Sequence, residues 1–168
     1  MQKLVVFLGN PGVQYKNTRH NAAWMFADTL GIGNWQEKFH SLYARSGDVF
    51  FQKPQTFMNL SGQAVQELAS FFKISPENIL VVHDDIELGF GEAVLRKGGG
   101  LAGHNGLRSL KQMLGTDGFW RLRLGVGRPE KQDVASYVLG RFSPVEEKCL
   151  GDVFAKASGL LEKYKSGV

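Results

Sequence analysis

Two short aliphatic runs constrain the fold more than any other feature of the chain, Leu4–Leu8 and Ile79–Val82. Both are continuous rather than alternating, which is typical of strands in the middle of a sheet that is covered on both faces. Helical spacing of apolar residues occurs in Asn21–Leu30, Asn59–Phe72 and Gly103–Leu114. We therefore predict an α/β fold with a single domain over residues 1–168, in which a twisted, mixed and largely parallel β-sheet is sandwiched between helices.

Shorter patterns add the remaining elements. Further strands are expected at Tyr43–Arg45, Val49–Lys53, Ala93–Arg96 and Leu122–Val126, the first two as a hairpin. Residues Pro144–Tyr164 predict a long C-terminal amphipathic helix with Ser143 as its N-cap and Cys149 on its apolar stripe.

Composition excludes several classes of protein. No apolar run approaches the roughly 18–20 residues that a membrane-spanning helix needs. The chain has one cysteine, so neither an internal disulfide nor a zinc site of paired cysteines can form, and a reducing, cytoplasmic setting is expected. The formal net charge of +4 is compatible with a polyanionic partner but is weak support for one.

Polar residues gather in five clusters that follow predicted strands or open predicted helices. The clusters are Gly9–Gly12, Thr18–Asn21, Phe57–Gly62, His83–Asp85 and Gly98–Gly106. Each has a simpler interpretation on its own, as a turn, an N-cap or a backbone acceptor. The carboxyl ends of parallel strands meet at one edge of a sheet, however, so these clusters are expected to share one crevice.

The side chains in these clusters suit acid–base hydrolysis. A histidine such as His20 can take a proton from water near neutral pH, and a carboxylate such as Asp84 fixes its tautomer. Asparagine amides can donate to a developing oxyanion. There is no nucleophile-elbow motif and Cys149 is expected to face the core, so water is the expected nucleophile.

Two other kinds of site stay open as alternatives. Gly98–Gly103 formally matches a dinucleotide fingerprint, but the preceding Glu92–Lys97 is a poor buried strand. The acidic residue that the fingerprint requires would be Asp117, and it does not lie at the end of a second strand. The four histidines with Asp84 and Asp85 could supply metal ligands, although no pair has the spacing of common zinc helices. The glycine-rich loop with nearby basic residues suits a phosphate or a nucleic-acid backbone better.

Taken together, the motifs resemble the bacterial peptidyl-tRNA hydrolase family over nearly the whole chain. The matching segments are Phe7–Gly12 with Tyr15, Thr18–Ala22, Lys53–Gly62, His83–Asp85, Gly98–Leu107, Arg121–Pro129 and Tyr137–Gly140. The resemblance implies an esterase that cleaves peptide from tRNA, with peptidyl-tRNA as its partner and no obligate protein partner. It also implies a cytoplasmic monomer that uses no metal or organic cofactor.

The resemblance also implies roles for individual residues. His20 would be the general base, Asp84 its orienting partner, and Asn10 a catalytic donor near the scissile ester. Peptide and the tRNA end would be bound by the remaining residues of the motifs, namely Tyr15, Phe57, Met58, Asn59, His104 and Asn105. Acceptor-stem phosphates would meet Arg96, Lys97 and Arg108.

The sequence departs from the family pattern at three places, one of which is that it stops soon after Tyr164 without the basic tail that some relatives carry. Leu101-Ala102 stand in the glycine-rich loop where the family often has a polar or basic residue and a glycine, and Asp85 stands where a glutamate is common. An RNA-binding domain that has lost activity is the alternative function, and the intact His20 and Asp84 argue against it.

Overall fold

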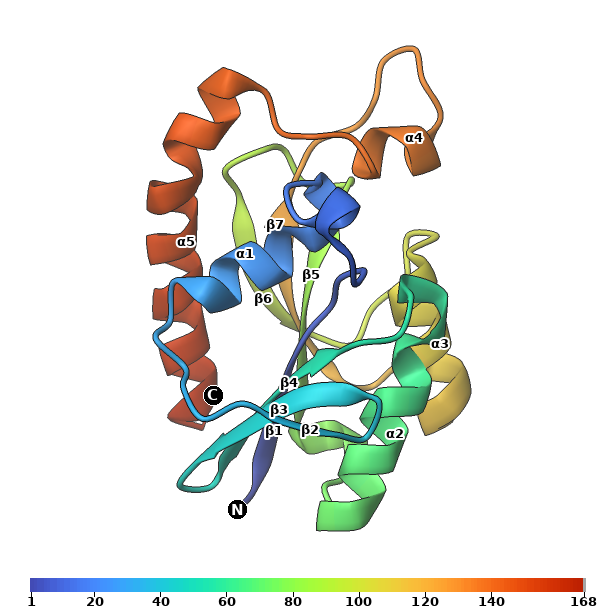
Figure 1. Cartoon of the computed structure of the whole chain (residues 1–168), viewed down its shortest axis with the longest axis vertical. Helices are drawn as coiled ribbons and strands as arrows, with labels where there is room; N and C mark the ends of the chain where they lie inside the picture. Colours follow the sequence, from blue (N-terminus) through green and yellow to red (C-terminus); the bar gives the residue numbers. More distant parts are fainter. Residues whose placement is uncertain (168) are drawn as a thin grey trace.

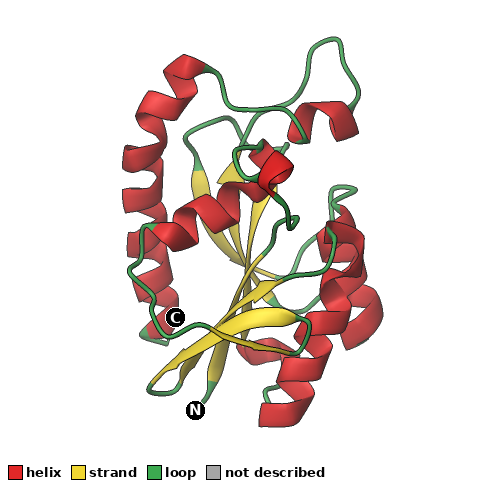
Figure 2. Cartoon of the chain, in the orientation of Figure 1, coloured by secondary structure: helices red, strands yellow, loops and turns green. Residues whose placement is uncertain are grey.

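A computed structural model describes residues 1–167, and within them it contains one seven-stranded sheet with helices on both faces (Figures 1 and 2). The strand order is β2-β3-β4-β1-β5-β7-β6. The strands are β1 (Lys3–Phe7), β2 (Gln36–Lys38), β3 (Ser41–Ser46), β4 (Val49–Pro54), β5 (Ile79–Asp85), β6 (Ala93–Lys97) and β7 (Trp120–Gly125). The four central strands are parallel and the outer ones antiparallel, which confirms the predicted mixed, largely parallel sheet.

Five α-helices and four 3₁₀ turns accompany the sheet in the described residues. The helices are α1 (Ala22–Asp28), α2 (Ser61–Phe72), α3 (Asn105–Leu114), α4 (Val134–Val138) and α5 (Pro144–Lys165). The 3₁₀ turns are η1 (Val13–Tyr15), η2 (Arg19–Asn21), η3 (Met58–Leu60) and η4 (Pro76–Asn78). Among residues 1–167, no helix combines the length and the apolar character needed to cross a membrane.

The two faces of the sheet build two separate cores. Val5 and Phe7 of β1 pack in a cluster with α1 and α5, whereas Leu4 and Val6 pack in a second cluster with α2 and α3. In Figure 1, α1 and α5 accordingly lie on one side of the sheet and α2 and α3 on the other. Because successive side chains point to opposite faces, a strand with a core on each face is apolar at every position.

The strand order changes direction at β1. From β1 the chain continues to β4 on one side of it, and then returns to β5 on the other side. Such a change of direction separates the loops that follow the two neighbouring strands, so a binding crevice is expected at the carboxyl ends of β1 and β5.

Some boundaries differ from those expected from the sequence. Strand β5 continues through Asp85 with all seven residues buried, so the polar cluster belongs to the strand itself. Helix α2 begins at Ser61 after the turn η3, and α3 begins at Asn105. Strand β2 and helix α4 were not predicted.

The long C-terminal helix is confirmed, with one correction. Ser143 is its N-cap, as predicted, and the structure adds that Ser143 forms a capping box with Glu146. The expected position of Cys149 on the apolar stripe is wrong, because Cys149 is exposed. The residues of α5 that are buried begin only at Val153, so its first two turns contribute no fully buried side chain.

The contact between α2 and α3 generates a stability prediction. A Cβ on Gly62 would lie 2.2 Å from the carbonyl oxygen of Ser109, so the two helices touch without room for a methyl group. We expect Gly62→Ala to lower the free energy of unfolding by about 1–3 kcal/mol or more, since this is the range typical of overpacking. Denaturant unfolding followed by circular dichroism measures this.

Gly159→Ala is the matched control, since a Cβ there would meet nothing within 4 Å on helix α5. Removing a glycine from a helix interior should raise the free energy of unfolding by about 0.5–1 kcal/mol. Equal effects of the two substitutions would contradict the close helix contact.

Candidate active site

His20 and Asp84 form a buried pair at the carboxyl end of the sheet. Asp84 lies in β5 and is 2% exposed, and His20 lies in η2, before α1. The Nδ1 atom of His20 is 2.9 Å from Oδ1 and 2.8 Å from Oδ2 of Asp84. A carboxylate only accepts hydrogen bonds, so His20 carries its proton on Nδ1 and keeps the lone pair on Nε2.

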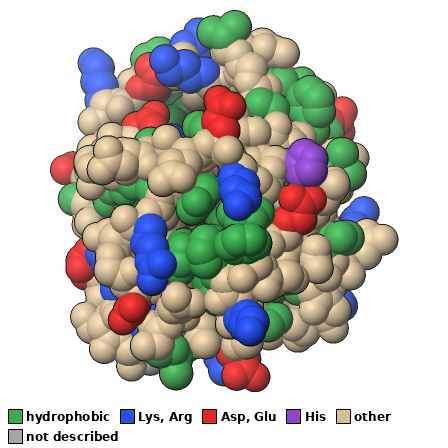
Figure 3. All heavy atoms as spheres, turned by 60° about the horizontal axis from the view of Figure 1, so that its bottom comes forward, with side chains coloured by type: hydrophobic (Ala, Val, Ile, Leu, Met, Phe, Trp, Pro, Cys, Tyr) green, Lys and Arg blue, Asp and Glu red, His purple; other side chains and the backbone are tan. Residues whose placement is uncertain are grey.

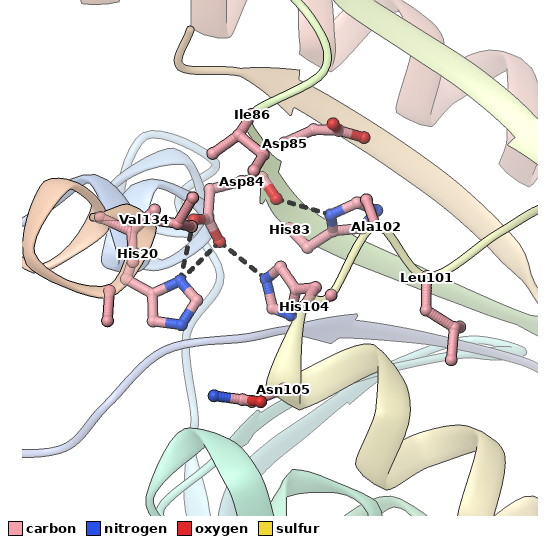
Figure 4. A pocket seen from close by; sticks show the side chains of 13 residues that line it. His20, His83, Asp84, Asp85, Ile86, Leu101, Ala102, His104, Asn105 and Val134 are labelled. Atoms are coloured by element: carbon pink, nitrogen blue, oxygen red, sulfur yellow. Dashed lines mark hydrogen bonds and ion pairs between the residues drawn. The ribbon is translucent and has the colours of Figure 1, made fainter. Parts of the chain in front are cut away.

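A second histidine shares the same carboxylate. The Nε2 atom of His104 lies 2.8 Å from Oδ1 of Asp84, and its Nδ1 accepts the backbone N–H groups of Gly106 and Leu107 as the N-cap of α3. His104 must therefore carry its proton on Nε2 and donate it to Asp84. Figure 4 shows Asp84 between the two imidazole rings.

These contacts set the charge states of the pair. Burial alone would raise the pKa of Asp84, but His20 and His104 hold it far below the usual range of a carboxyl group. Burial alone would lower the pKa of His20, yet the charge of Asp84 and the hydrogen bond to it outweigh burial and raise this pKa above 6.5.

His83, the third histidine at the site, is held neutral. Burial, and next the neighbouring His104, lower its pKa to about 4. Its Nδ1 is 2.8 Å from the carbonyl oxygen of Asp84, while its buried Nε2 finds no hydrogen-bond partner within residues 1–167. His83 therefore forms an uncharged wall next to the acid–base pair.

The pair opens onto a cavity of about 220 Å³. One wall is the glycine-rich loop with Leu101 and Ala102, and the other is α4 with Val134, Ala135 and Val138 (Figure 4). The polar end of the cavity is formed by the catalytic candidates and their neighbours, namely His20, His83, Asp84, Asp85, His104 and Asn105. The cavity can thus receive a mainly apolar group beside a buried base.

Asn10 connects two loops and is not among the residues that line this cavity. Its Oδ1 accepts the backbone N–H of Met58 at 2.7 Å. Its backbone N–H donates to Oδ1 of Asn21 at 2.9 Å, and its carbonyl oxygen accepts from Nδ2 of Asn21 at 3.0 Å. With Oδ1 engaged, the remaining polar group of the Asn10 side chain is the donor Nδ2.

Met58 then joins these loops to α3. A Cβ on Gly106 would lie 2.7 Å from Sδ of Met58 and 3.1 Å from Cε1 of His104, so the three groups are packed together. Met58 is buried and is not among the residues that line the cavity. Asn59 and Asn105 are exposed, on η3 and at the first position of α3.

An apolar surface continues outward from η1 and η3. Tyr15 and Phe57 contact each other edge to face with ring centroids 6.3 Å apart, and Phe57 is 54% exposed. The resemblance implied that both residues bind substrate. The structure places Tyr15 in η1 and Phe57 at the start of η3, and neither lines the cavity.

A smaller cavity of about 50 Å³ lies behind the glycine-rich loop and is bordered by cations. Arg123 donates from Nε to Oδ2 of Asp85 at 2.8 Å, and Arg121 donates to the carbonyl oxygens of Gly100 and Asp117. The candidate Arg96 lines this cavity, so it lies beside the site. Asp85 is paired with Arg123, whereas Asp84 is paired with histidines, so the two neighbouring carboxylates have different partners.

The other two basic candidates are exposed, Lys97 at the end of β6 and Arg108 on α3. Figure 3 shows the face at the other end of the molecule, away from the cavity. Hydrophobic, basic and acidic side chains are intermixed there. No uniformly basic area is visible on that face.

Two groups of residues were missed by the sequence reasoning. Arg121 and Arg123 alternate with buried leucines along β7, and this period of two was a readable sign of a polar face. The cavity residues of α4 gave no such sign, because a five-residue helix is too short to show a helical period.

One group in the described residues could hold a metal ion. His20, Asp84 and His104 each offer a ligand atom, and these atoms lie within 4.8 Å of one another. The same three residues are joined by the hydrogen bonds described above.

Comparisons with known proteins identify the family of the chain. The sequence model of the family described as peptidyl-tRNA hydrolase matches residues 4–167. A peptidyl-tRNA hydrolase of Lactobacillus delbrueckii subsp. bulgaricus is 43% identical, with 98% of this chain and 94% of the relative covered. One of Marinobacter nauticus is 48% identical, with 98% and 89% covered.

Solved structures give the same result for the fold. The crystal structure of peptidyl-tRNA hydrolase from Acinetobacter baumannii superposes with a TM-score of 0.84 at 36% identity, covering 98% of this chain and 91% of that one. Sequence and structure together show that the chain belongs to the peptidyl-tRNA hydrolase family.

Proposed function

We propose that this protein hydrolyses the ester bond between peptide and tRNA in peptidyl-tRNA, releasing free tRNA and peptide. Family membership supports this activity. The structural observation that supports it best is the hydrogen bond between Nδ1 of His20 and the buried Asp84. That bond leaves the basic Nε2 beside a cavity with an apolar wall. A general base needs this arrangement, whereas a domain that only binds RNA does not.

In the proposed reaction His20 activates water. Nε2 takes a proton from the water molecule as its oxygen attacks the ester carbonyl carbon, and Asp84 stabilises the imidazolium that results. Nδ2 of Asn10 donates to the oxyanion of the tetrahedral intermediate. The carbon–oxygen bond to the ribose then breaks, and His20 returns the proton to the leaving ribose oxygen.

Binding is assigned to residues of the cavity and to residues at the turns η1 and η3. Tyr15, Phe57, Met58, Asn59, His104 and Asn105 would hold the peptide and the end of the tRNA. Arg96, Lys97 and Arg108 would neutralise acceptor-stem phosphates, since phosphate contacts supply affinity without reading sequence. We propose a cytoplasmic monomer that needs no metal or organic cofactor.

Replacing the base tests this function. We expect His20→Ala to lower the turnover of a peptidyl-tRNA with a blocked amino end by about 100-fold or more, the usual contribution of a general base. The wild type should spare free aminoacyl-tRNA. His40→Ala is the matched control, because His40 is an exposed histidine paired with Glu67 at 3.0 Å, outside the residues that line the cavity.

Two outcomes would contradict the proposal. A wild type that binds tRNA without cleaving peptidyl-tRNA would favour the RNA-binding domain. Full activity of a folded His20→Ala variant would reject His20 as the base, and His104 would be replaced next.

The pH profile tests the pair itself. The reaction needs neutral His20, so kcat/KM should rise with pH through the pKa of His20, with a midpoint above 6.5. In Asp84→Asn the lowering by burial is no longer opposed, so the midpoint should move below 6.5 while kcat falls by about 100-fold. Rates measured from pH 5 to 9 give both midpoints.

Asp28→Asn is the control for this profile, because Asp28 is an exposed carboxylate on α1 that pairs with Lys53. It should leave the midpoint unchanged. An Asp84→Asn enzyme that kept the wild-type midpoint would show that Asp84 does not set the pKa of the base.

A further inference from the structure

Arg19 immediately precedes His20, yet it takes no part in the reaction proposed above. Its side chain is 12% exposed and lies under the segment that links α4 to α5. Nη1 donates to the carbonyl oxygen of Tyr137 at 3.1 Å, and Nη2 lies 3.5 Å from Oε1 of Glu146. The donors of this cation are therefore directed into the protein rather than toward solvent.

The guanidinium also stacks on the last turn of α4. Its Cζ lies 4.0 Å from the centroid of the Tyr137 ring, the geometry of a cation–π contact. The hydroxyl of Tyr137 donates to the carbonyl oxygen of Val126 at 2.6 Å, in the loop after β7. Tyr137 is thus held by Arg19 at its ring face and by the loop after the sheet at its hydroxyl.

Backbone contacts extend the same attachment. The N–H of Arg19 donates to the carbonyl oxygen of Gly140 at 2.9 Å, and Thr18 forms an isolated β-bridge with Arg141. A Cβ on Gly140 would lie 3.1 Å from Nη1 of Arg19. Residue 140 is therefore packed so closely on the guanidinium that a larger residue would press against it.

Glu146 connects Arg19 to α5 as well. Its Oε1 accepts the backbone N–H of Ser143 at 2.9 Å in the capping box, and the same oxygen faces Arg19. One arginine thus contacts both the end of α4 and the first turn of α5.

The position of α4 matters because it forms one wall of the cavity. Val134, Ala135 and Val138 face the space beside His20, and Figure 4 shows Val134 close to the His20 ring. In Figure 1, α4 lies beside the segment that carries His20. Arg19 therefore contacts α4, the element that forms the cavity wall opposite the glycine-rich loop.

We propose that Arg19 is a positioning residue that sets substrate affinity by fixing α4 against the segment that carries His20. The inference rests on the proposed function, since the affinity concerned is that for peptidyl-tRNA. It differs from a direct phosphate contact, because Nη1 and Nη2 of Arg19 contact groups of the protein and Nε is buried without a partner in the described residues. It also differs from a role in proton transfer, because Arg19 contacts neither ring nitrogen of His20 nor Asp84 in the described residues.

Steady-state kinetics of the full chain on peptidyl-tRNA test the inference. Arg19→Ala should raise KM about tenfold while kcat changes less than about threefold, the pattern of lost binding that is equal in ground and transition states. The acid limb of the pH profile should keep its midpoint. The slope of log KM against log salt concentration should also stay the same, because no phosphate contact is lost.

Two further variants separate geometry from charge. Arg19→Lys keeps the charge but loses the planar stack and the forked donors, so it should restore KM only in part. Gly140→Ala keeps Arg19 but displaces its guanidinium, so it should raise KM in the same direction by a smaller factor. If Arg19→Ala does not fold, the KM values of these two variants still test the inference.

Arg45→Ala is the control, because Arg45 is an exposed arginine that stacks on Phe50 and donates to Gly47 at the β3–β4 turn. It should leave both constants unchanged. A fall in kcat with constant KM, a shifted acid limb or a salt slope smaller by about one would each overturn the inference. An inactive wild type would instead contradict the proposed function.

Discussion

A buried carboxylate stays ionised only where hydrogen-bond donors replace the water that it has lost. Asp84 meets this condition with His20 on one side and His104 on the other, both at 2.8 Å. The three residues come from η2, β5 and the residue before α3, which are far apart in the sequence. The charge of one side chain is therefore favourable only when three separate parts of the chain have come together, and this makes the site depend on the complete fold.

The pleat of β5 explains how two neighbouring acids take different roles. Successive side chains of a strand point to opposite faces of the sheet. Asp84 consequently meets the two imidazoles, while Asp85 meets Arg123 at the smaller cavity. An aspartate at position 85 is short, and its Oδ1 also accepts the backbone N–H of Glu87, so it supports the turn after β5 as well as the arginine. The departure from the common glutamate is thus accommodated within the second cavity and leaves the acid–base pair unaffected.

The fold was predictable where burial dictates the sequence. The runs Leu4–Leu8 and Ile79–Val82 have a core on each face and can be nothing but apolar, so they identify the two central strands. Strand β2 could not be predicted, because its three residues are exposed and are held by backbone pairing with β3. Cys149 was misplaced for a related reason. Helical periodicity identifies a face, but it does not tell how far along the helix the core extends, and here the core begins at Val153.

The pairing of His20 with Asp84 could be expected because both residues follow parallel strands or open helices at one edge of the sheet. The second role of His104 could not, because N-caps are usually serine, threonine, aspartate or asparagine. An imidazole can cap α3 only with an unprotonated Nδ1, and this requires the proton to be on Nε2, where it reaches Asp84. The N-terminus of α3 therefore fixes the tautomer of His104, and His104 in turn holds Oδ1 of Asp84. A proton added to Nδ1 would remove the cap acceptor. Capping of α3 and the orientation of the Asp84 carboxylate therefore depend on the same chain of hydrogen bonds.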